Sequence, residues 1–117
     1  MSYMLLIVEP TEQRRERGVE AGKAVYERML RFTADLQARG VLEASNSLAS
    51  TRKATRLQVR NGQHHVLDGP FAEAKEMVGG FFLVNVATRE EAMAIAAECP
   101  AAEWATIEVR AVGPCYD

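Results

Sequence analysis

Two short runs of the sequence are apolar on both faces of the strand that each predicts. Residues 3–8 read Tyr-Met-Leu-Leu-Ile-Val, and residues 80–87 read Gly-Phe-Phe-Leu-Val-Asn-Val-Ala. Because successive side chains of a strand point to opposite faces of its sheet, both runs place large apolar groups on each face. Such strands are typical of the interior of a sheet that is covered on both sides. We therefore expect these two runs to be the central strands of the fold.

Two helices are predicted between and after these strands. Apolar side chains recur at helical spacing over residues 19–39, and Gly40 follows where the helix would end. Thr88 begins the sequence Thr-Arg-Glu-Glu, a capping box that favours a helix from Arg89, and Pro100 ends that helix. Each helix has one apolar side and is therefore expected to pack on a sheet.

Shorter extended segments complete the pattern. Residues 54–60 and 63–67 flank Asn61-Gly62, which predicts a tight hairpin. Residues 105–112 alternate as a last strand, whereas residues 41–50 give the mixed signals of an extended connection with a short edge strand. The order is strand, helix, hairpin, strand, helix, strand. It indicates an α+β protein with the split β-α-β arrangement of ferredoxin-like folds, an antiparallel sheet and an extra hairpin strand.

The doubly apolar strands also predict a partner. Two helices cover only one face of a sheet of four or five strands, so the second apolar face needs another cover. Phe81 or Phe82 left in water would forfeit about 1.5–3 kcal/mol relative to burial. We therefore expect a homodimer in which the sheets of two copies face each other.

The composition restricts the class of protein. The 117 residues are 48% hydrophobic and 26% charged, which predicts one globular domain over residues 1–117. The formal net charge of −2 argues against direct binding of nucleic acid, which needs a concentrated basic surface. The longest apolar run is too short to cross a membrane, and two cysteines at no metal-binding spacing indicate a reduced, cytoplasmic setting without a metal site. The sequence contains no phosphate-binding glycine motif or nucleophile elbow, so we expect no cofactor.

The segment from Asp68 to Phe82 is the predicted functional loop, because a sharp turn, a block of charges and a glycine pair occur together in it. Asp68 is the candidate catalytic residue. Beside Phe71 in a partly apolar cleft, it would lose hydration and become a usable proton donor or acceptor near neutral pH. The alternative is a structural carboxylate that binds the backbone amides of the turn.

Other residues of the predicted site supply charge. Pro70 suits the first turn of a helix, so residues 71–78 are predicted to form a short one. Lys75 is then placed to bind a carboxylate or phenolate, with Glu73 or Glu76 as its partner; the alternative is a solvated charged turn. Arg56 either helps to bind an anionic ligand inside the barrel or belongs to a surface ladder of charges.

Several segments carry a resemblance to a known family. They are Tyr3-Met4-Leu5-Leu6-Ile7, Ala54-Thr55-Arg56, residues 68–76 (Asp-Gly-Pro-Phe-Ala-Glu-Ala-Lys-Glu) followed by Gly79-Gly80-Phe81, and Glu108-Val109-Arg110. On these residues the whole chain resembles the YCII-related family, and more narrowly its DGPF-domain branch. The resemblance implies a ferredoxin-like dimeric α+β barrel with a cleft near the sheet.

The resemblance also bears on function. Proteins similar to this branch are often encoded beside extracytoplasmic-function sigma factors, and their biochemical role is mostly unestablished. A few wider relatives are enzymes on small aromatic compounds, including a dehydrochlorinase, and others carry a proposed His-Asp catalytic pair. This chain has no clear counterpart to that histidine, because His64 and His65 lie in the predicted hairpin.

Two functions follow from the sequence. The first is a cofactor-independent enzyme or binder of a small anionic or aromatic ligand, with Asp68 in proton transfer and Lys75, Arg56, Glu73 and Phe71 around the ligand. The second is a non-catalytic dimeric accessory protein associated with a sigma factor or transcription, which would bind its partner through the charged helix over residues 23–39.

Overall fold

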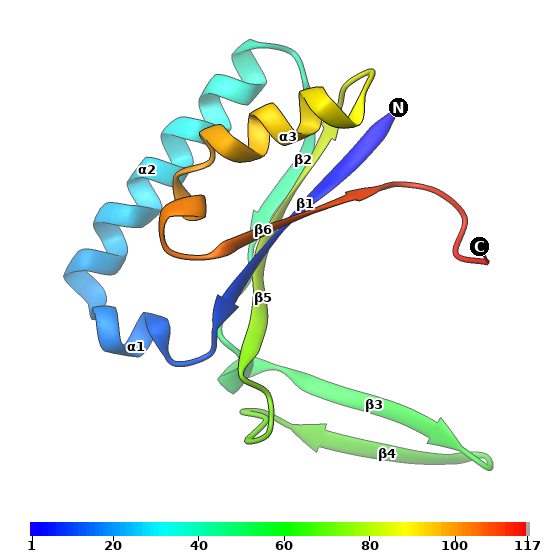
Figure 1. The fold of residues 1–117 in the computed structure, drawn as a ribbon. Coiled ribbons are helices and arrows are strands. Elements are labelled where there is room, and N and C mark those ends of the chain that lie inside the picture. The colour runs from blue at the N-terminus through cyan, green and yellow to red at the C-terminus, as the bar shows by residue number, and fades with distance from the viewer. Residues whose placement is uncertain (117) are drawn as a thin grey trace.

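The structure is a computed structural model that describes residues 1–116. Its strands are β1 (Ser2–Pro10), β2 (Leu42–Ser47), β3 (Thr55–Arg60), β4 (Gln63–Asp68), β5 (Glu76–Asn85) and β6 (Thr106–Ala111). Its α-helices are α1 (Gln13–Arg17), α2 (Val19–Ala38) and α3 (Arg89–Glu98), with short 3₁₀ turns η1 (Thr51–Lys53) and η2 (Pro100–Glu103). Figure 1 shows their arrangement.

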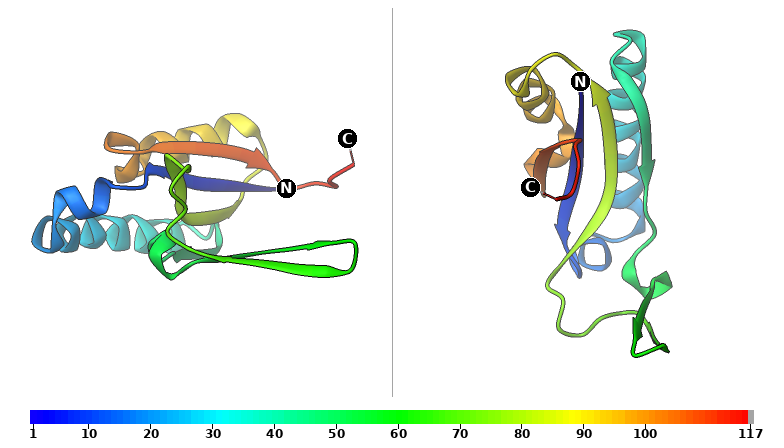
Figure 2. Two further views of the ribbon diagram at one scale, coloured as in Figure 1. Left: turned by 90° about the horizontal axis from the view of Figure 1, so that it is seen from below. Right: turned by 90° about the vertical axis from the view of Figure 1, so that its right-hand side faces the viewer.

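Four strands form an antiparallel sheet in the order β2-β5-β1-β6, and α2 and α3 lie on one side of it (Figures 1 and 2). The two doubly apolar runs are the central strands β1 and β5, as predicted. This strand order and the two helices on one face make the protein a ferredoxin-like α+β fold.

The core lies between the sheet and the helices. Leu5 on β1 and Val84 on β5 are completely buried, as is Leu36 on α2. The rings of Phe32 on α2 and Phe82 on β5 meet edge to face, with their centroids 5.2 Å apart. Such aromatic pairs add to the stabilisation that burial alone provides.

Helix α3 begins as the capping box predicts. The amide of Glu91 donates to Thr88 Oγ1 over 3.2 Å, and the carboxylate of Glu91 accepts from the amide of Ala87 over 2.9 Å. The apolar side of the helix buries Ala92, Ile95 and Ala96, and Cys99 is buried directly after it.

The other side of the sheet carries six apolar side chains, which we call the open face. They form three cross-strand pairs of β1 and β5, Met4 with Leu83, Leu6 with Phe81 and Val8 with Val78. Neighbouring side chains leave most of them half-buried, and Val78 is exposed.

The hairpin predicted around Asn61-Gly62 is present, but it does not add the expected extra strand to the main sheet. Asn61 and Gly62 have φ angles of 52° and 76°, as the tight turn requires. However, β3 and β4 form a two-stranded sheet of their own that projects from the molecule (Figure 1). The edge position beside β5 is taken by β2, from the region of mixed signals.

The helix predicted over residues 71–78 is also wrong. Residues 71–75 form a turn, and β5 begins at Glu76, four residues before the predicted strand. Met77 pairs with Glu9, and the amide of Thr11 donates to the carbonyl of Lys75 over 3.0 Å. Pairing with β1 therefore satisfies the backbone hydrogen-bonding groups of this segment, so they do not need a helix.

Candidate functional site

A cleft of about 980 Å³ opens between α2 and the sheet. It exists because α2 packs tightly only through its second half, where Phe32 and Leu36 are buried. Nearer the start of the helix, Tyr26 and Leu30 are about half exposed. The helix and the sheet therefore enclose a space along α2 from its start to Thr33.

The walls of the cleft are mainly apolar. Its larger apolar and aromatic lining residues, apart from Phe81 of the open face, are Ile7, Val25, Tyr26, Met29, Leu30, Phe82 and Trp104. Ligand pockets of this size and character accommodate small organic molecules, which lose most of their contact with water on binding.

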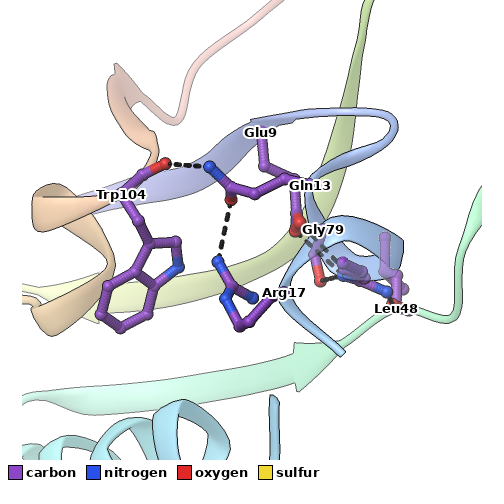
Figure 3. Close-up of polar contacts among 7 residues, drawn as sticks. Glu9, Gln13, Arg17, Leu48, Gly79 and Trp104 are labelled. Atoms are coloured by element: carbon purple, nitrogen blue, oxygen red, sulfur yellow. Dashed lines mark hydrogen bonds and ion pairs between the residues drawn. The ribbon is translucent and has the colours of Figure 1, made fainter. Parts of the chain in front are cut away.

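A buried ion pair lies at one end of the cleft. Glu9 is only 6% exposed, and its carboxylate accepts from Nε and Nη2 of Arg14 over 3.1 Å and 2.9 Å. Arg14 also donates to the carbonyl oxygens of Leu48 and Gly79 over 2.8 Å and 3.2 Å. This one guanidinium therefore connects α1, the end of β1, β5 and the segment after β2. Figure 3 labels its partners Glu9, Leu48 and Gly79.

Gly79 provides the space for this ion pair. A Cβ atom at position 79 would lie 1.6 Å from Oε1 of Glu9 and 2.8 Å from Nη2 of Arg14. The register of β1 and β5 shifts at this point, between Ile7 and Val8, as at a β-bulge. Position 79 therefore requires glycine, because any side chain would collide with the ion pair of Glu9 and Arg14.

The polar mouth of the cleft is basic. Four of the residues that line the cleft are cationic, namely Arg14, Arg15, Arg17 and Lys23. Two are anionic, Glu9 and Glu27. The lining therefore has two more cations than anions, but Glu12 and Glu20, which do not line the cleft, pair with Arg15 and Lys23.

Trp104 forms one side of the mouth between two guanidinium groups. The Cζ atoms of Arg17 and Arg28 each lie 5.5 Å from the centre of its ring. Gln13 donates to the carbonyl of Trp104 over 2.7 Å and accepts from Nη2 of Arg17 over 3.0 Å (Figure 3). These contacts fix the orientation of Arg17 beside the indole.

Arg28 is held from its other side by an exposed acid. Its Nη2 lies 2.6 Å from Oε2 of Glu103, and this hydrogen bond is the main cause that lowers the pKa of Glu103. The same contact raises the pKa of Arg28.

The site residues predicted from the sequence lie elsewhere. Asp68 ends β4, is exposed, and accepts from the hydroxyl of Thr55 over 2.9 Å. Lys75 and Glu73 are in the turn that precedes β5, where Glu73 is exposed. The guanidinium of Arg56 stacks on the ring of Phe71 at 3.7 Å, which brings these two predicted residues together.

A second cavity of about 360 Å³ lies against the turn of residues 69–75. Phe71 is the one predicted site residue among the residues that line it. Asp68, Arg56, Glu73 and Lys75 line neither of the two cavities. Arg14 and Arg15 line both, so the start of α1 is the wall between them.

Sequence reasoning missed Glu9 and Arg14, and it gave a cleft near the sheet only as what the family resemblance implies, without its lining residues. One signal for Glu9 was available, because it continues the alternation of Tyr3, Leu5 and Ile7 and so points to the helix-covered side. A carboxylate at such a position needs a cationic partner. The cleft had no comparable signal, because it depends on how far α2 stands from the sheet.

The profile of the YCII-related domain matches residues 1–115. The chain belongs to the YCII-related family. It is also 44% identical over 46 residues to an uncharacterized protein of Rhizobium meliloti (strain 1021). That match covers 39% of this YCII-related chain and 37% of the rhizobial protein, so the chain spans well under two thirds of its relative.

Across the described residues of this YCII-related chain, none of the helices combines the length and apolar character that a membrane crossing would need.

Proposed function

We propose that this YCII-related protein binds a small organic acid with an apolar or aromatic body, and that the ligand occupies the cleft between α2 and the sheet. The observation that carries the proposal is that one cleft of about 980 Å³ combines apolar walls with an excess of cationic over anionic lining residues. The sequence of residues 68–71, Asp-Gly-Pro-Phe, supports the finer assignment of the chain to the DGPF-domain branch.

The body of the ligand is expected between the helix and the sheet. Met29 and Leu30 of α2 line the cleft together with Ile7 and Phe82 of the sheet. Burial of apolar ligand surface at such walls yields about 25 cal/mol per Å² before the costs of association. Aromatic acids suit these walls best, because Tyr26 and Trp104 offer ring surfaces near the mouth.

The acid group is expected near Arg17 and Lys23. Arg14 already donates to four protein oxygens, so it mainly fixes the wall. Arg17 donates to Gln13 through Nη2 and keeps further donors for a carboxylate. Nζ of Lys23 lies 3.8 Å from Oε1 of Glu20, and both side chains are exposed. Such an ion pair is weak, so Lys23 can leave Glu20 to bind the acid group of a ligand.

A second candidate site is the turn of residues 69–75. In that alternative, Asp68 transfers a proton, and Arg56, Phe71, Glu73 and Lys75 surround the ligand. The stacking of Arg56 on Phe71 and the cavity of about 360 Å³ beside Phe71 support it. The exposure of Asp68 and its hydrogen bond to Thr55 favour the cleft instead.

Thermal-shift screening with aromatic and aliphatic carboxylates, followed by calorimetry with the strongest compound, tests the proposal. Gly22 lines the cleft, and a Cβ atom there would meet no other atom within 4 Å, so Gly22→Leu should fill the mouth without a clash. We expect Gly22→Leu to abolish binding and Arg17→Gln to weaken it about tenfold or more. Gly22→Ala is the matched control, because it also replaces the helical glycine but leaves the space unfilled.

The same measurements separate the two sites. Asp68→Asn should leave the affinity unchanged if the ligand lies in the cleft. Loss of binding in Asp68→Asn, with normal binding in Gly22→Leu, would move the site to the turn of residues 69–75. Absence of binding by every acid, together with recovery of a specific protein partner, would favour the non-catalytic accessory role.

A further inference from the structure

The buried carboxylate of Glu9 is only partly occupied by protein donors. Glu9 is 6% exposed, and among residues 1–116 its carboxylate accepts hydrogen bonds from Arg14 alone, over 3.1 Å and 2.9 Å. An ionised carboxylate has two oxygens with about four acceptor positions. Arg14 fills two of them, so Glu9 can accept further hydrogen bonds.

The cleft is the space from which another molecule reaches this carboxylate. Glu9 is one of the residues that line the cleft, and it does not line the smaller cavity beside Phe71. Ile7, two positions earlier on the same side of β1, lines the cleft as well. A ligand that lies between α2 and the sheet can therefore donate a hydrogen bond to Glu9.

The surrounding structure holds the carboxylate in one position. A Cβ atom on Gly79 would lie 1.6 Å from Oε1 of Glu9, so the acid fills the space beside this glycine. The guanidinium of Arg14 is itself bound to the carbonyls of Leu48 and Gly79. An acceptor that is fixed before binding loses little conformational freedom when a ligand arrives, which favours affinity.

A ligand that fills the apolar cleft also removes water from Glu9. If the ligand has no hydrogen-bond donor at this point, the carboxylate loses its interaction with water and gains nothing in return. Leaving a buried charged acceptor without a partner costs more free energy than leaving a neutral one. The cleft should therefore select ligands that carry a donor.

We infer that Glu9 is a specificity-determining residue, and that the ligand of the cleft is an organic acid with a second polar group, a neutral hydrogen-bond donor that binds the carboxylate of Glu9. This inference rests on the proposed function, because it concerns the same ligand. The acid group of the ligand lies near Arg17 and Lys23, and its hydroxyl or N–H group donates to Glu9.

The charges around Glu9 favour a neutral donor over an ammonium group. Nη2 of Arg14 lies 2.9 Å from Oε1 of Glu9, so the negative charge of the acid is already balanced. Cationic residues also outnumber anionic ones in the lining of the cleft. An ammonium group beside Glu9 would be repelled by the guanidinium of Arg14, whereas a hydroxyl group adds no charge.

Calorimetry on the full chain with substituted benzoates and phenylacetates tests the inference. A hydroxyl group in the meta or para position is compared with a methyl group of similar size and with a methoxy group, which accepts hydrogen bonds but cannot donate them. We expect at least one hydroxyl compound to bind at least about tenfold more tightly than its methyl and methoxy counterparts. Likewise, para-(hydroxymethyl)benzoate should bind more tightly than para-(aminomethyl)benzoate, which carries an ammonium group.

Variants of Glu9 test whether it is the acceptor. Glu9→Gln keeps the size of the side chain but replaces one carboxylate oxygen with an N–H donor, and it should reduce the preference for the hydroxyl compound to less than about threefold. The double variant Glu9→Gln with Arg14→Gln provides the same test if the single variant does not fold. Glu27→Gln is the matched control, because Glu27 is the other acid that lines the cleft and is exposed; this variant should keep the full preference.

The outcomes separate this inference from the proposed function. Equal binding of the hydroxyl, methoxy and methyl compounds by the wild type would overturn the role of Glu9 and leave the acid-binding cleft in place. A hydroxyl preference that survives in the Glu9 variants would also overturn it, because the donor would then bind elsewhere. Failure of every acid to bind would remove the proposed function and this inference together.

Discussion

Glu9 and Gly79 fit so closely at the irregularity between β1 and β5 that a methyl group on residue 79 would lie 1.6 Å from the carboxylate of Glu9. The carboxylate occupies the space that any other residue would fill, and Arg14 holds it there over 2.9 Å. The glycine, the acid and the arginine therefore act as one unit at the end of the cleft.

Gly79→Ala should destabilise the protein by about 2–4 kcal/mol, because the methyl group displaces a buried, paired carboxylate. Urea unfolding measures the loss. Gly113→Ala is the control, since Gly113 has open space around it and should change the stability by less than about 0.5 kcal/mol. Equal effects of the two substitutions would show that Gly79 has no special role.

Arg14→Gln should cost about 2–3 kcal/mol, because it leaves Glu9 buried without its cation; the partial exposure of Arg14 reduces the penalty from that of a fully buried pair. Adding Glu9→Gln should recover part of the loss. A double-mutant cycle by urea unfolding checks this. Strict additivity of the two substitutions would contradict the coupling of Glu9 and Arg14.

The two cysteines should differ in reactivity. Burial raises the pKa of the Cys99 thiol, so little thiolate forms at about pH 8, and the side chain is also out of reach of reagents. Cys115 is exposed. Iodoacetamide followed by mass spectrometry should modify Cys115 in the native protein and both cysteines in urea; equal native labelling would contradict the buried position of Cys99.

Thr88→Ala should lower the stability by about 1 kcal/mol, because the amide of Glu91 loses its cap at the start of α3. Arg89→Ala, at the first exposed helical position, is the control and should be close to neutral. Thermal unfolding followed by circular dichroism compares them. A larger loss in Arg89→Ala than in Thr88→Ala would be inconsistent with the cap.

The elements that the sequence predicted correctly are those that local patterns determine. Residues 3–8 and 80–85 form central strands because their side chains are apolar on both faces, and Thr88 caps a helix through contacts within four residues. The Asn61-Gly62 turn likewise depends on two backbone angles.

The errors arise where distant contacts decide. Residues 71–78 resemble a helical turn after Pro70, yet pairing of Met77 with Glu9 extends β5 into this segment. The cleft requires α2 to touch the sheet at Phe32 and Leu36 and to stand away from it near Tyr26. A helical pattern fixes which side of a helix is apolar and says nothing of its distance from the sheet.

The hairpin is inserted at a point where the sheet is already complete. β2 and β5 are adjacent antiparallel neighbours, and their pairing runs to Ser47 opposite Gly80, with the amide of Leu48 donating to the carbonyl of Gly79 over 2.9 Å. A short turn would suffice to join the two strands. The strands of residues 55–68 pair only with each other, so a change in their length would leave the register of the four-stranded sheet unaltered.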